Sequence, residues 1–342
     1  MDKSYANYFK DKVVLVTGGT GSIGSEIVRK LLAFPLKQVR IFSRDEFKQY
    51  NLGMALKDQP AGRVSFLIGD IRDRDRIFLA MEGVNVVFNA AAMKHVPLCE
   101  YNPFEAVKTN VLGTQNVVDA CRANNVEKFV HVSTDKAAFP SNVMGATKLL
   151  AEKIALAAAN YKGPHKTIYS CVRFGNVFGS RGSVVPLFVQ QIRDGNSVTV
   201  TDKEMTRFIM RIPEAAELVI KAGVLSNGEE LFILKMPVMK INDLANAMID
   251  LLAPRFNRRP GEIEVKIIGR RDGEKLYELL MTEDEAGSIY ENDEMICISK
   301  KPLDGFIQSK TKNYRSDQCQ LMKPEEIREF LKPSLEALEK LI

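Results

Sequence analysis

The chain of 342 residues has no tryptophan, only three histidines and five cysteines, and no run of about 18 apolar residues. The cysteines stand far apart without a C-x-x-C pair, and only three histidines are available to complete a metal site, so we expect free thiols and no metal. Residues 1–12 carry charge and lack the apolar core of a signal peptide. These absences predict a cytoplasmic protein without membrane insertion.

Charge gives little indication of nucleic-acid binding. The formal net charge is +5, but 48 basic residues are dispersed among 43 acidic ones, and no basic block with interleaved aromatic residues occurs. A hydrophobic content of 45% and a charged content of 27% are typical of a globular protein. A phosphorylated small molecule explains the basic excess equally well, and we expect no nucleic-acid partner.

Short β-branched runs alternate with amphipathic stretches in the first half of the chain. The alternating segments are residues 13–17, 26–32, 39–43, 64–68, 84–89, 107–121, 129–133 and 148–158. Such alternation predicts an α/β fold, a Rossmann-type doubly wound parallel sheet with helices on both faces. In such sheets ligands bind beyond the carboxyl ends of the strands.

The pattern becomes less regular after about residue 170, where glycine and proline interrupt it. We expect a dinucleotide-binding domain over residues 1–175, to which some later segments return, and a smaller mixed substrate-binding lobe with C-terminal helices over residues 176–342. Helices are expected at 210–221, 242–252 and 324–331, with another reaching 342, and a strand at 231–234.

A glycine-rich turn joins the first expected strand to the first expected helix. Gly18, Gly21 and Gly24 have G-x-x-G-x-x-G spacing, which allows backbone N–H groups to approach a pyrophosphate closely. The order of strand, glycines and helix is the one that dinucleotide sites require. The expected cofactor-binding residues of this turn are Gly18, Thr20, Gly21, Ser22, Ile23 and Gly24.

The following strand ends decide the expected cofactor. Ser43 and Arg44 stand where NAD-selective sites usually place a carboxylate, so a 2′-phosphate is accommodated and NADP is favoured over NAD, although acids follow at once. Asp70 is expected to accept from the adenine amino group, or else to cap a turn, and Ile71 to pack on the ring. Ala90 and Ala91 are small enough to let the cofactor lie close to the sheet.

Several motifs resemble the extended short-chain dehydrogenase/reductases. They are the glycine turn, Asn89-Ala90-Ala91-Ala92, Ser133-Thr134-Asp135-Lys136-Ala137 and Lys148. A closer resemblance, over roughly residues 10–290, is to the UDP-N-acetylglucosamine 4,6-dehydratases of the polysaccharide-biosynthesis branch. The further matching motifs are Phe42-Ser43-Arg44-Asp45-Glu46, Arg173-Phe174-Gly175-Asn176-Val177, Gly179-Ser180-Arg181-Gly182-Ser183-Val184, Met205-Thr206-Arg207-Phe208 and Gly273-Glu274-Lys275.

The resemblance implies a dehydration in which no net oxidation occurs. Oxidation at C4 acidifies the C5 proton, water is eliminated across C5 and C6, and hydride returns to C6. Asp135 would protonate the leaving C6 hydroxyl and Lys136 would remove the C5 proton; related hexose dehydratases have glutamate at the position of Lys136. Lys136 must then be neutral, and we expect burial and neighbouring positive charge to lower its pKa.

One position departs from the family pattern. Met144 stands four residues before Lys148, where most short-chain dehydrogenases have tyrosine, and a thioether transfers no proton. Lys148 can still bind the nicotinamide ribose. The sequence hypothesis for the C4 hydroxyl proton is that Asp135 or Lys136, with Thr134 and a water, receives it.

The second lobe is expected to bind a UDP-sugar in a homo-oligomeric enzyme. The candidate substrate-binding residues are Lys94, Asn176, Ser183, Arg207, Arg271 and Glu274. Guanidinium groups suit diphosphate oxygens, although structural ion pairs are the alternative role for each arginine.

Three alternatives stay open at this point. The sequence around Met144 slightly favours retention over inversion at C5. A UDP-sugar 4-epimerase shares the C4 oxidation but has no need of the Asp135–Lys136 pair. A non-catalytic NADP-sensing protein would keep the fold and lose the chemistry, and Met144 is the best argument for it.

Overall fold

The computed structural model describes residues 3–161, 163–180, 182–270, 273–285 and 288–336. The chain divides into two compact units that interleave along the sequence. Unit 1 comprises Met1–Phe174, Pro213–Lys235 and Thr282–Lys312, and unit 2 comprises Gly175–Ile212, Met236–Met281 and Asn313–Ile342. The first crossing falls between Phe174 and Gly175, and two later segments belong to unit 1.

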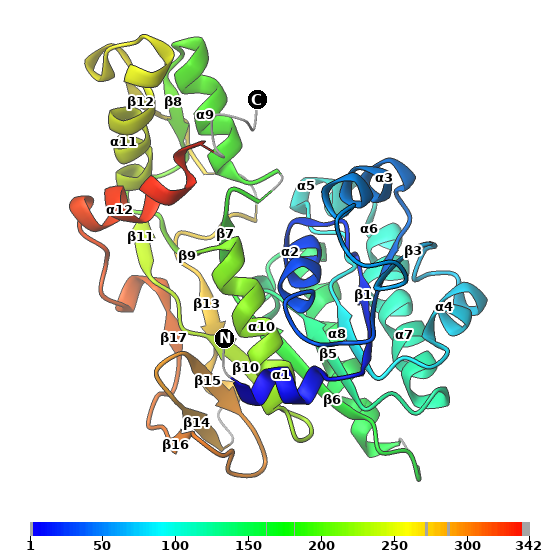
Figure 1. Cartoon of the computed structure of the whole chain (residues 1–342). Coiled ribbons are helices and arrows are strands. Elements are labelled where there is room, and N and C mark those ends of the chain that lie inside the picture. Colours follow the sequence, from blue (N-terminus) through cyan, green and yellow to red (C-terminus); the bar gives the residue numbers. More distant parts are fainter. Residues whose placement is uncertain (1–2, 162, 181, 271–272, 286–287, 337–342) are drawn as a thin grey trace. The chain divides into compact units, whose positions relative to one another are not determined.

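Unit 1 is built on a ten-stranded sheet of order β16-β14-β15-β10-β6-β5-β4-β1-β2-β3 (Figure 1). All pairs from β3 to β10 are parallel, while β15, β14 and β16 extend the sheet in antiparallel fashion. The strands are β1 (Val13–Thr17), β2 (Gln38–Ser43), β3 (Val64–Ile68), β4 (Val86–Asn89), β5 (Lys128–Val132), β6 (Ile168–Arg173), β10 (Leu231–Leu234), β14 (Ile289–Glu291), β15 (Met295–Ile298) and β16 (Ile307–Gln308). The strand order reverses direction between β1 and β4, which is where doubly wound sheets bind their ligands.

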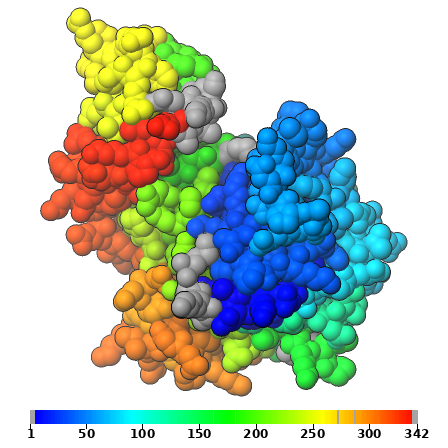
Figure 2. Space-filling view, in the orientation of Figure 1, coloured from blue at the N-terminus to red at the C-terminus, as the bar shows by residue number. Residues whose placement is uncertain are grey.

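Helices cover both faces of this sheet (Figure 1). They are α1 (Lys3–Phe9), α2 (Ser22–Leu31), α3 (Glu46–Ala55), α4 (Arg74–Met81), α5 (Val96–Tyr101), α6 (Pro103–Ala106), α7 (Gly113–Ala123), α8 (Val143–Ala157) and α10 (Ile212–Leu225), with a π-helical turn at Val107–Leu112. Every residue of β1 is buried, as expected for a strand covered on both faces. The orange segment that carries β14 to β16 lies at the surface (Figure 2).

Unit 2 is smaller and consists of short sheets and helices. Its strands pair as β11-β9-β7, β12-β8 and β13-β17. The elements are β7 (Asn176–Phe178), β8 (Val198–Val200), β9 (Thr206–Arg211), β11 (Val238–Lys240), β12 (Val265–Ile267), β13 (Leu279–Met281), β17 (Tyr314–Arg315), α9 (Val184–Asp194), α11 (Ile241–Leu252) and α12 (Pro324–Leu331). Apolar residues of α9, α11 and α12 form its core, among them Phe188, Leu244 and Ile327.

The predicted α/β fold is confirmed, and several expected boundaries were wrong. The helix expected at 210–221 begins at Ile212, because residues 210 and 211 end strand β9. The stretch expected at 148–158 begins earlier, at Val143, since Asn142 caps the helix by accepting from the backbone N–H of Gly145. The end of the expected last helix, residues 337–342, lies outside the described residues.

A buried ionic network joins β6, α8 and a later segment of unit 1. The guanidinium of Arg173, with 1% of its side chain exposed, donates to both carboxylate oxygens of Glu152 at 2.7 and 2.5 Å. It also donates to both oxygens of Glu285 at 2.8 and 2.7 Å. Such a network is costly to break from one side, because the remaining carboxylate stays buried without its counter-charge.

We predict that Arg173→Met lowers the free energy of unfolding by about 3–5 kcal/mol, since the carboxylate of Glu152 would lose its buried partner. The matched control is Arg29→Met, which breaks a more exposed contact with Glu26 in α2 and should cost at most about 1 kcal/mol. Urea unfolding of the three proteins measures both effects. Equal midpoints for Arg173→Met and the wild type would contradict the structural role of this network.

Candidate active site

The glycine turn brings the start of α2 against the ends of β1 and β4. Gly18 has φ +62°, and a Cβ there would lie 2.8 Å from backbone atoms of Ala90 and Ala91. A Cβ at Gly24 would lie 2.3 Å from the carbonyl oxygen of Gly18, which accepts a hydrogen bond from the backbone N–H of Gly21 at 2.8 Å. Only glycine fits this close approach, and the result is the cradle that a dinucleotide pyrophosphate requires at a helix N-terminus.

The end of β2 presents a hydroxyl and a guanidinium. The Oγ atom of Ser43 lies 2.7 Å from Oγ1 of Thr20, so the strand end is tied to the glycine turn. The Arg44 side chain is 64% exposed, and its Nη1 lies 3.8 Å from Oδ2 of Asp70. Asp45, the first acid after the strand, is the N-cap of α3 and accepts from a backbone N–H of its first turn. The strand end thus presents an exposed guanidinium beside the carboxylate of Asp70.

Asp70 is engaged by a neighbouring arginine. Its carboxylate accepts from the backbone N–H of Arg72 at 3.0 Å and from the guanidinium at 2.9 and 2.6 Å. Partial burial acts to raise the pKa of Asp70, but the hydrogen bonds and charge of Arg72 outweigh it and lower that pKa overall. The turn-capping interpretation of Asp70 therefore has geometric support. Ile71, 3% exposed, packs against Gly113, and contacts of either residue with adenine stay predictions.

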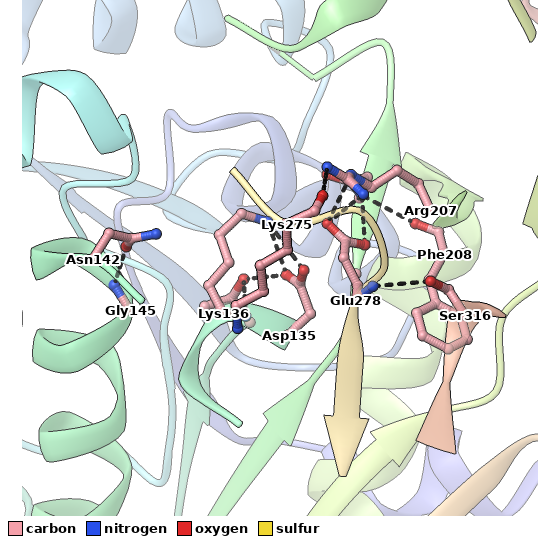
Figure 3. A network of polar contacts seen from close by, with 12 residues as sticks. Asp135, Lys136, Asn142, Gly145, Arg207, Phe208, Lys275, Glu278 and Ser316 are labelled. Carbon is pink, nitrogen blue, oxygen red and sulfur yellow. Dashed lines mark hydrogen bonds and ion pairs between the residues drawn. The ribbon is translucent and has the colours of Figure 1, made fainter. Parts of the chain in front are cut away.

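The acid and the base predicted for the dehydration form a contact at the end of β5 (Figure 3). Nζ of Lys136 lies 3.1 and 3.0 Å from the two carboxylate oxygens of Asp135. Thr134 donates from its hydroxyl to Asp135 at 2.6 Å. The Asp135 side chain is 2% exposed and that of Lys136 is 32% exposed, so the acid is sheltered and the amine faces outward.

Helix α8 packs closely on the loop that carries this pair. Gly145 makes the approach possible, because a Cβ there would lie 2.5 Å from the carbonyl oxygen of Lys136. Met144 is 3% exposed and belongs to an apolar cluster with Cys99 and Ala106. The methionine thus fills a packed site between helices where a tyrosine would bring a hydroxyl.

Lys148, one turn beyond Met144, lies within the protein. Its Nζ contacts Nε2 of His131 at 2.9 Å and donates to the carbonyl oxygen of Val132 at 2.7 Å. Burial lowers the pKa of Lys148 to about 8, against the opposing charge of Glu152. The lowered pKa expected for Lys136 stays a prediction.

Two buried polar residues of the strands, His131 and Asn89, were assigned no role from the sequence, although Asn89 begins one of the matching motifs. Nδ1 of His131 lies 3.1 Å from Nδ2 of Asn89, whose Oδ1 accepts from the hydroxyl of Thr17 at 2.5 Å. His131 is 1% exposed and Asn89 is fully buried. The available signal was a polar residue in each otherwise apolar strand, Phe-Val-His-Val and Val-Val-Phe-Asn.

Predicted substrate residues of unit 2 converge on a residue that the sequence analysis did not single out. Nδ2 of Asn176 donates to the carboxylate of Glu278 at 2.9 and 3.1 Å. Nε of Arg207 lies 3.2 Å from the same carboxylate (Figure 3). The Arg207 guanidinium also donates to carbonyl oxygens of residues 206, 275 and 276. Arg207 therefore has the structural ion pair that was its alternative role, and its contact with substrate stays a prediction.

The remaining predicted substrate residues differ in burial and in the unit to which they belong. Within the described part of the chain, the buried Oγ of Ser183, the N-cap of α9, has no hydrogen-bond partner. Lys94 is exposed and belongs to unit 1, while Glu274 is half-buried in unit 2. Arg271 lies outside the described residues.

Comparisons with known proteins place the chain in a family. The family described as "Polysaccharide biosynthesis protein" matches residues 14–300. An inverting UDP-N-acetylglucosamine 4,6-dehydratase of Campylobacter jejuni is 43% identical, with 85% of this chain and 84% of the relative covered. A UDP-glucose 4-epimerase of Rickettsia rickettsii is 40% identical, with 94% and 96% covered.

A third relative has a different kind of name. The "Uncharacterized membrane protein MJ1061" of Methanocaldococcus jannaschii is 50% identical, with 97% of this chain and 98% of the relative covered. In the chain studied here, the described segments contain no helix with the length and apolar character needed to cross a bilayer.

Solved structures support the same fold. The structure of Pen from Bacillus thuringiensis is 46% identical with a TM-score of 0.89, and 95% of this chain and 98% of that chain are covered. DesIV, a dTDP-glucose 4,6-dehydratase of Streptomyces venezuelae with NAD and TYD bound, is 24% identical with a TM-score of 0.68 over 77% and 86%, which supports the fold alone. Together with the family match, these relatives confirm the resemblance. The chain belongs to the polysaccharide biosynthesis protein family, and it is a nucleotide-sugar-modifying enzyme of the extended short-chain dehydrogenase/reductase type, a 4,6-dehydratase or a 4-epimerase.

Proposed function

We propose that the enzyme dehydrates UDP-N-acetylglucosamine to a UDP-4-keto-6-deoxy-N-acetylhexosamine, for the synthesis of surface glycans. The observation that carries this proposal is the contact between Asp135 and Lys136, 3.0 Å apart at the carboxyl end of β5. Eliminating water requires an acid for the leaving hydroxyl and a base for the adjacent carbon, and both occur here as neighbours. The dehydratase relative at 43% identity supports the same reaction.

A nicotinamide dinucleotide fits the glycine cradle of unit 1. When bound, it would supply the hydride acceptor for C4 of the sugar and the hydride donor for C6, with no net oxidation. The turn from Gly18 to Gly24 would hold its pyrophosphate, and Ala90 and Ala91 would leave room beside the sheet. We propose NADP, because Ser43 and the exposed Arg44 end β2; NAD, present in the DesIV structure, is the alternative.

The contact between Asp135 and Lys136 is that of a carboxylate with an ammonium, but the proposed reaction needs both groups in their neutral forms. A lysine removes a proton only as a neutral amine, and a carboxyl group donates one only when protonated. The reactive state is thus the neutral form of each group. Lys136 takes the C5 proton and Asp135 gives its proton to the departing C6 hydroxyl, which leaves the two groups as the ion pair of the structure. Thr134, which donates to Asp135, orients the carboxyl group.

The nucleotide end of the substrate is assigned to unit 2. Ser183 supports this assignment, because its partnerless hydroxyl, among the residues described, stands at the N-terminus of an 11-residue helix, where an anion is favoured. Asn176, Arg207, Arg271 and Glu274 complete the proposed set, with Lys94 from unit 1. We expect these residues to bind phosphate, uracil and ribose, and the enzyme to assemble as a cytoplasmic homo-oligomer.

A UDP-sugar 4-epimerase is the second candidate, favoured by the relative at 40% identity with that name. Epimerisation preserves the mass of the sugar, whereas dehydration removes one water. The sequence around Met144 favours retention at C5, while the dehydratase relative is named inverting. The configuration at C5 is therefore read from the product together with its mass.

Incubation with UDP-N-acetylglucosamine, followed by mass and proton NMR analysis, should show a product that has lost one water. Lys136→Ala should reduce this turnover by about 10²–10⁴-fold while the cofactor remains bound, since the base is removed. Lys153→Ala, an exposed residue of α8, is the control and should keep the wild-type rate. Unchanged mass with altered configuration would mean epimerisation, and substantial activity of Lys136→Ala would remove that residue from the base role.

The cofactor proposal is tested separately. Arg44→Asp should weaken binding of NADP by about tenfold or more relative to NAD, because a carboxylate repels the 2′-phosphate and accepts from a ribose hydroxyl. Titration calorimetry with both cofactors measures the ratio, and Arg74→Asp on the neighbouring helix α4 controls for the change in net charge. Equal losses of affinity for NADP and NAD would show that Arg44 does not discriminate between the two cofactors.

A further inference from the structure

A row of hydrogen-bonded, buried polar side chains links α8 to the ends of β5, β4 and β1. The donors and acceptors in this row determine which of its nitrogen and oxygen atoms carry a hydrogen. The row runs from Lys148 through His131 and Asn89 to Thr17, with contacts of 2.9, 3.1 and 2.5 Å. All four side chains belong to unit 1 and are nine-tenths buried or more. Each donor in such a setting needs an acceptor.

Asn89 has a defined orientation. Thr17 accepts a hydrogen bond from the backbone N–H of Ala91 at 3.3 Å, and its own short 2.5 Å contact suits a hydroxyl that donates to the amide oxygen. Thr114 has already given its one hydrogen to the carbonyl oxygen of Asn110 at 2.7 Å, so toward Asn89 it can only accept. The NH₂ group of Asn89 therefore faces Nδ1 of His131.

This orientation selects one tautomer of His131. Burial, reinforced by the charge of Lys148, holds the pKa of His131 well below its ordinary value, so the ring is neutral. Because Nδ1 accepts from Asn89, the single ring proton sits on Nε2 and points at Nζ of Lys148, 2.9 Å away. An ammonium has no lone pair to receive it. The contact is satisfied when Lys148 is a neutral amine that accepts from His131 and donates to Val132.

The charged groups around Lys148 agree with this state. Glu152, one turn along α8, would favour an ammonium, but both of its carboxylate oxygens are bound by Arg173 at 2.7 and 2.5 Å. Cys171 of β6 also faces Lys148, and burial raises its pKa well above the ordinary value, so it stays an uncharged thiol. His131 is neutral as well. No uncompensated negative charge adjoins the amine among the described residues.

We propose that Lys148 is held as a neutral amine by the Nε2–H of His131 and that this amine receives the proton of the C4 hydroxyl in the reaction proposed above. The inference rests on that proposed function. Met144 precedes Lys148 by one turn and transfers no proton. Lys148 therefore accepts the C4 hydroxyl proton that a tyrosine at position 144 would otherwise accept. The sequence hypothesis gave this proton to Asp135 or Lys136; the present assignment leaves that pair to the elimination.

Lys148 acts in the oxidation at C4. The O–H bond at C4 breaks, its proton binds Nζ of Lys148, and its electron pair becomes the second bond of the ketone as hydride leaves C4 for the oxidised nicotinamide. Lys136 then takes the C5 proton while Asp135 gives its proton to the C6 hydroxyl, which leaves as water. When hydride returns to C6, the proton held by Lys136 returns to C5. Lys148 then releases its proton to solvent, and the carboxylate of Asp135 takes up a proton from solvent, so both groups return to their starting forms. His131 is a positioning residue, because it acts through Lys148.

The first test needs neither substrate nor cofactor. ¹⁵N NMR of histidine-labelled protein reports the tautomer, and His131→Gln identifies the signal among only three histidines. At about pH 9 we expect Nε2 of His131 to carry the proton and Nδ1 to carry none. The ¹³Cε signal of Lys148, identified by its loss in Lys148→Met, should titrate near pH 8. A proton on Nδ1, or an ammonium that persists above about pH 10, would overturn the proposal.

A variant tests the coupling between the two residues. His131→Gln offers an amide oxygen that accepts from an ammonium, so the pKa of Lys148 should rise by about one unit or more. His165→Gln, distant in sequence and bound to Asn125, is the control and should leave it unchanged. A role of His131 in packing alone would not move this titration, and an unmoved pKa would remove His131 from the positioning role.

Kinetics complete the test. Turnover should rise as the pH increases through the pKa of Lys148, near 8, because the neutral amine is the acceptor. Lys148→Arg keeps the positive charge but is always protonated, so kcat should fall by about 10²–10⁴-fold, and Lys148→Met should show a similar loss. Wild-type turnover in Lys148→Arg would contradict the proposal. If no dehydration occurs at all, the proposed function fails while the NMR result still decides the state of Lys148.

Discussion

The contact between Lys148 and His131 is the interaction on which the site depends. A lysine placed among the ends of parallel strands, out of water, loses the hydration that keeps it charged. The histidine gives it one defined hydrogen-bond partner, and Asn89 and Thr17 hold the histidine from two neighbouring strands. The sheet therefore sets the chemistry of this amine before any ligand arrives.

The same edge of the sheet also carries the glycine turn for the dinucleotide and the acid–base pair proposed for the elimination of water. The glycine turn after β1 leaves room for a dinucleotide, and the loop after β5 presents Asp135 and Lys136. Gly145 lets α8 approach that loop, so Lys136 and Lys148 come from adjoining elements of unit 1. One lysine is half-exposed beside an acid, and the other is buried beside a neutral ring, which suits them to different proton transfers.

Much of this arrangement was predictable from the sequence, because strands and glycine turns carry local signals. The bounds of β1, β3 and β10 were predicted to the residue. The position of the glycine turn followed from its spacing, whereas the loop with Asp135 and Lys136 was singled out through the family resemblance. The role of His131 was not predictable, since it depends on which strands are neighbours. Glu278 likewise can be recognised only when β13 and β9 are in place, and the lowered pKa of Lys148 depends on burial that the sequence alone does not show.

The central claim is that a temporary ketone at C4 lets an amine remove the proton at C5. The most direct measurement follows deuterium placed on C4 of UDP-N-acetylglucosamine, with the product analysed by NMR. The account predicts that the label appears on the C6 methyl group of a product that has lost water. A label that returns to C4 of an unchanged-mass sugar, or that is lost to solvent, would contradict it.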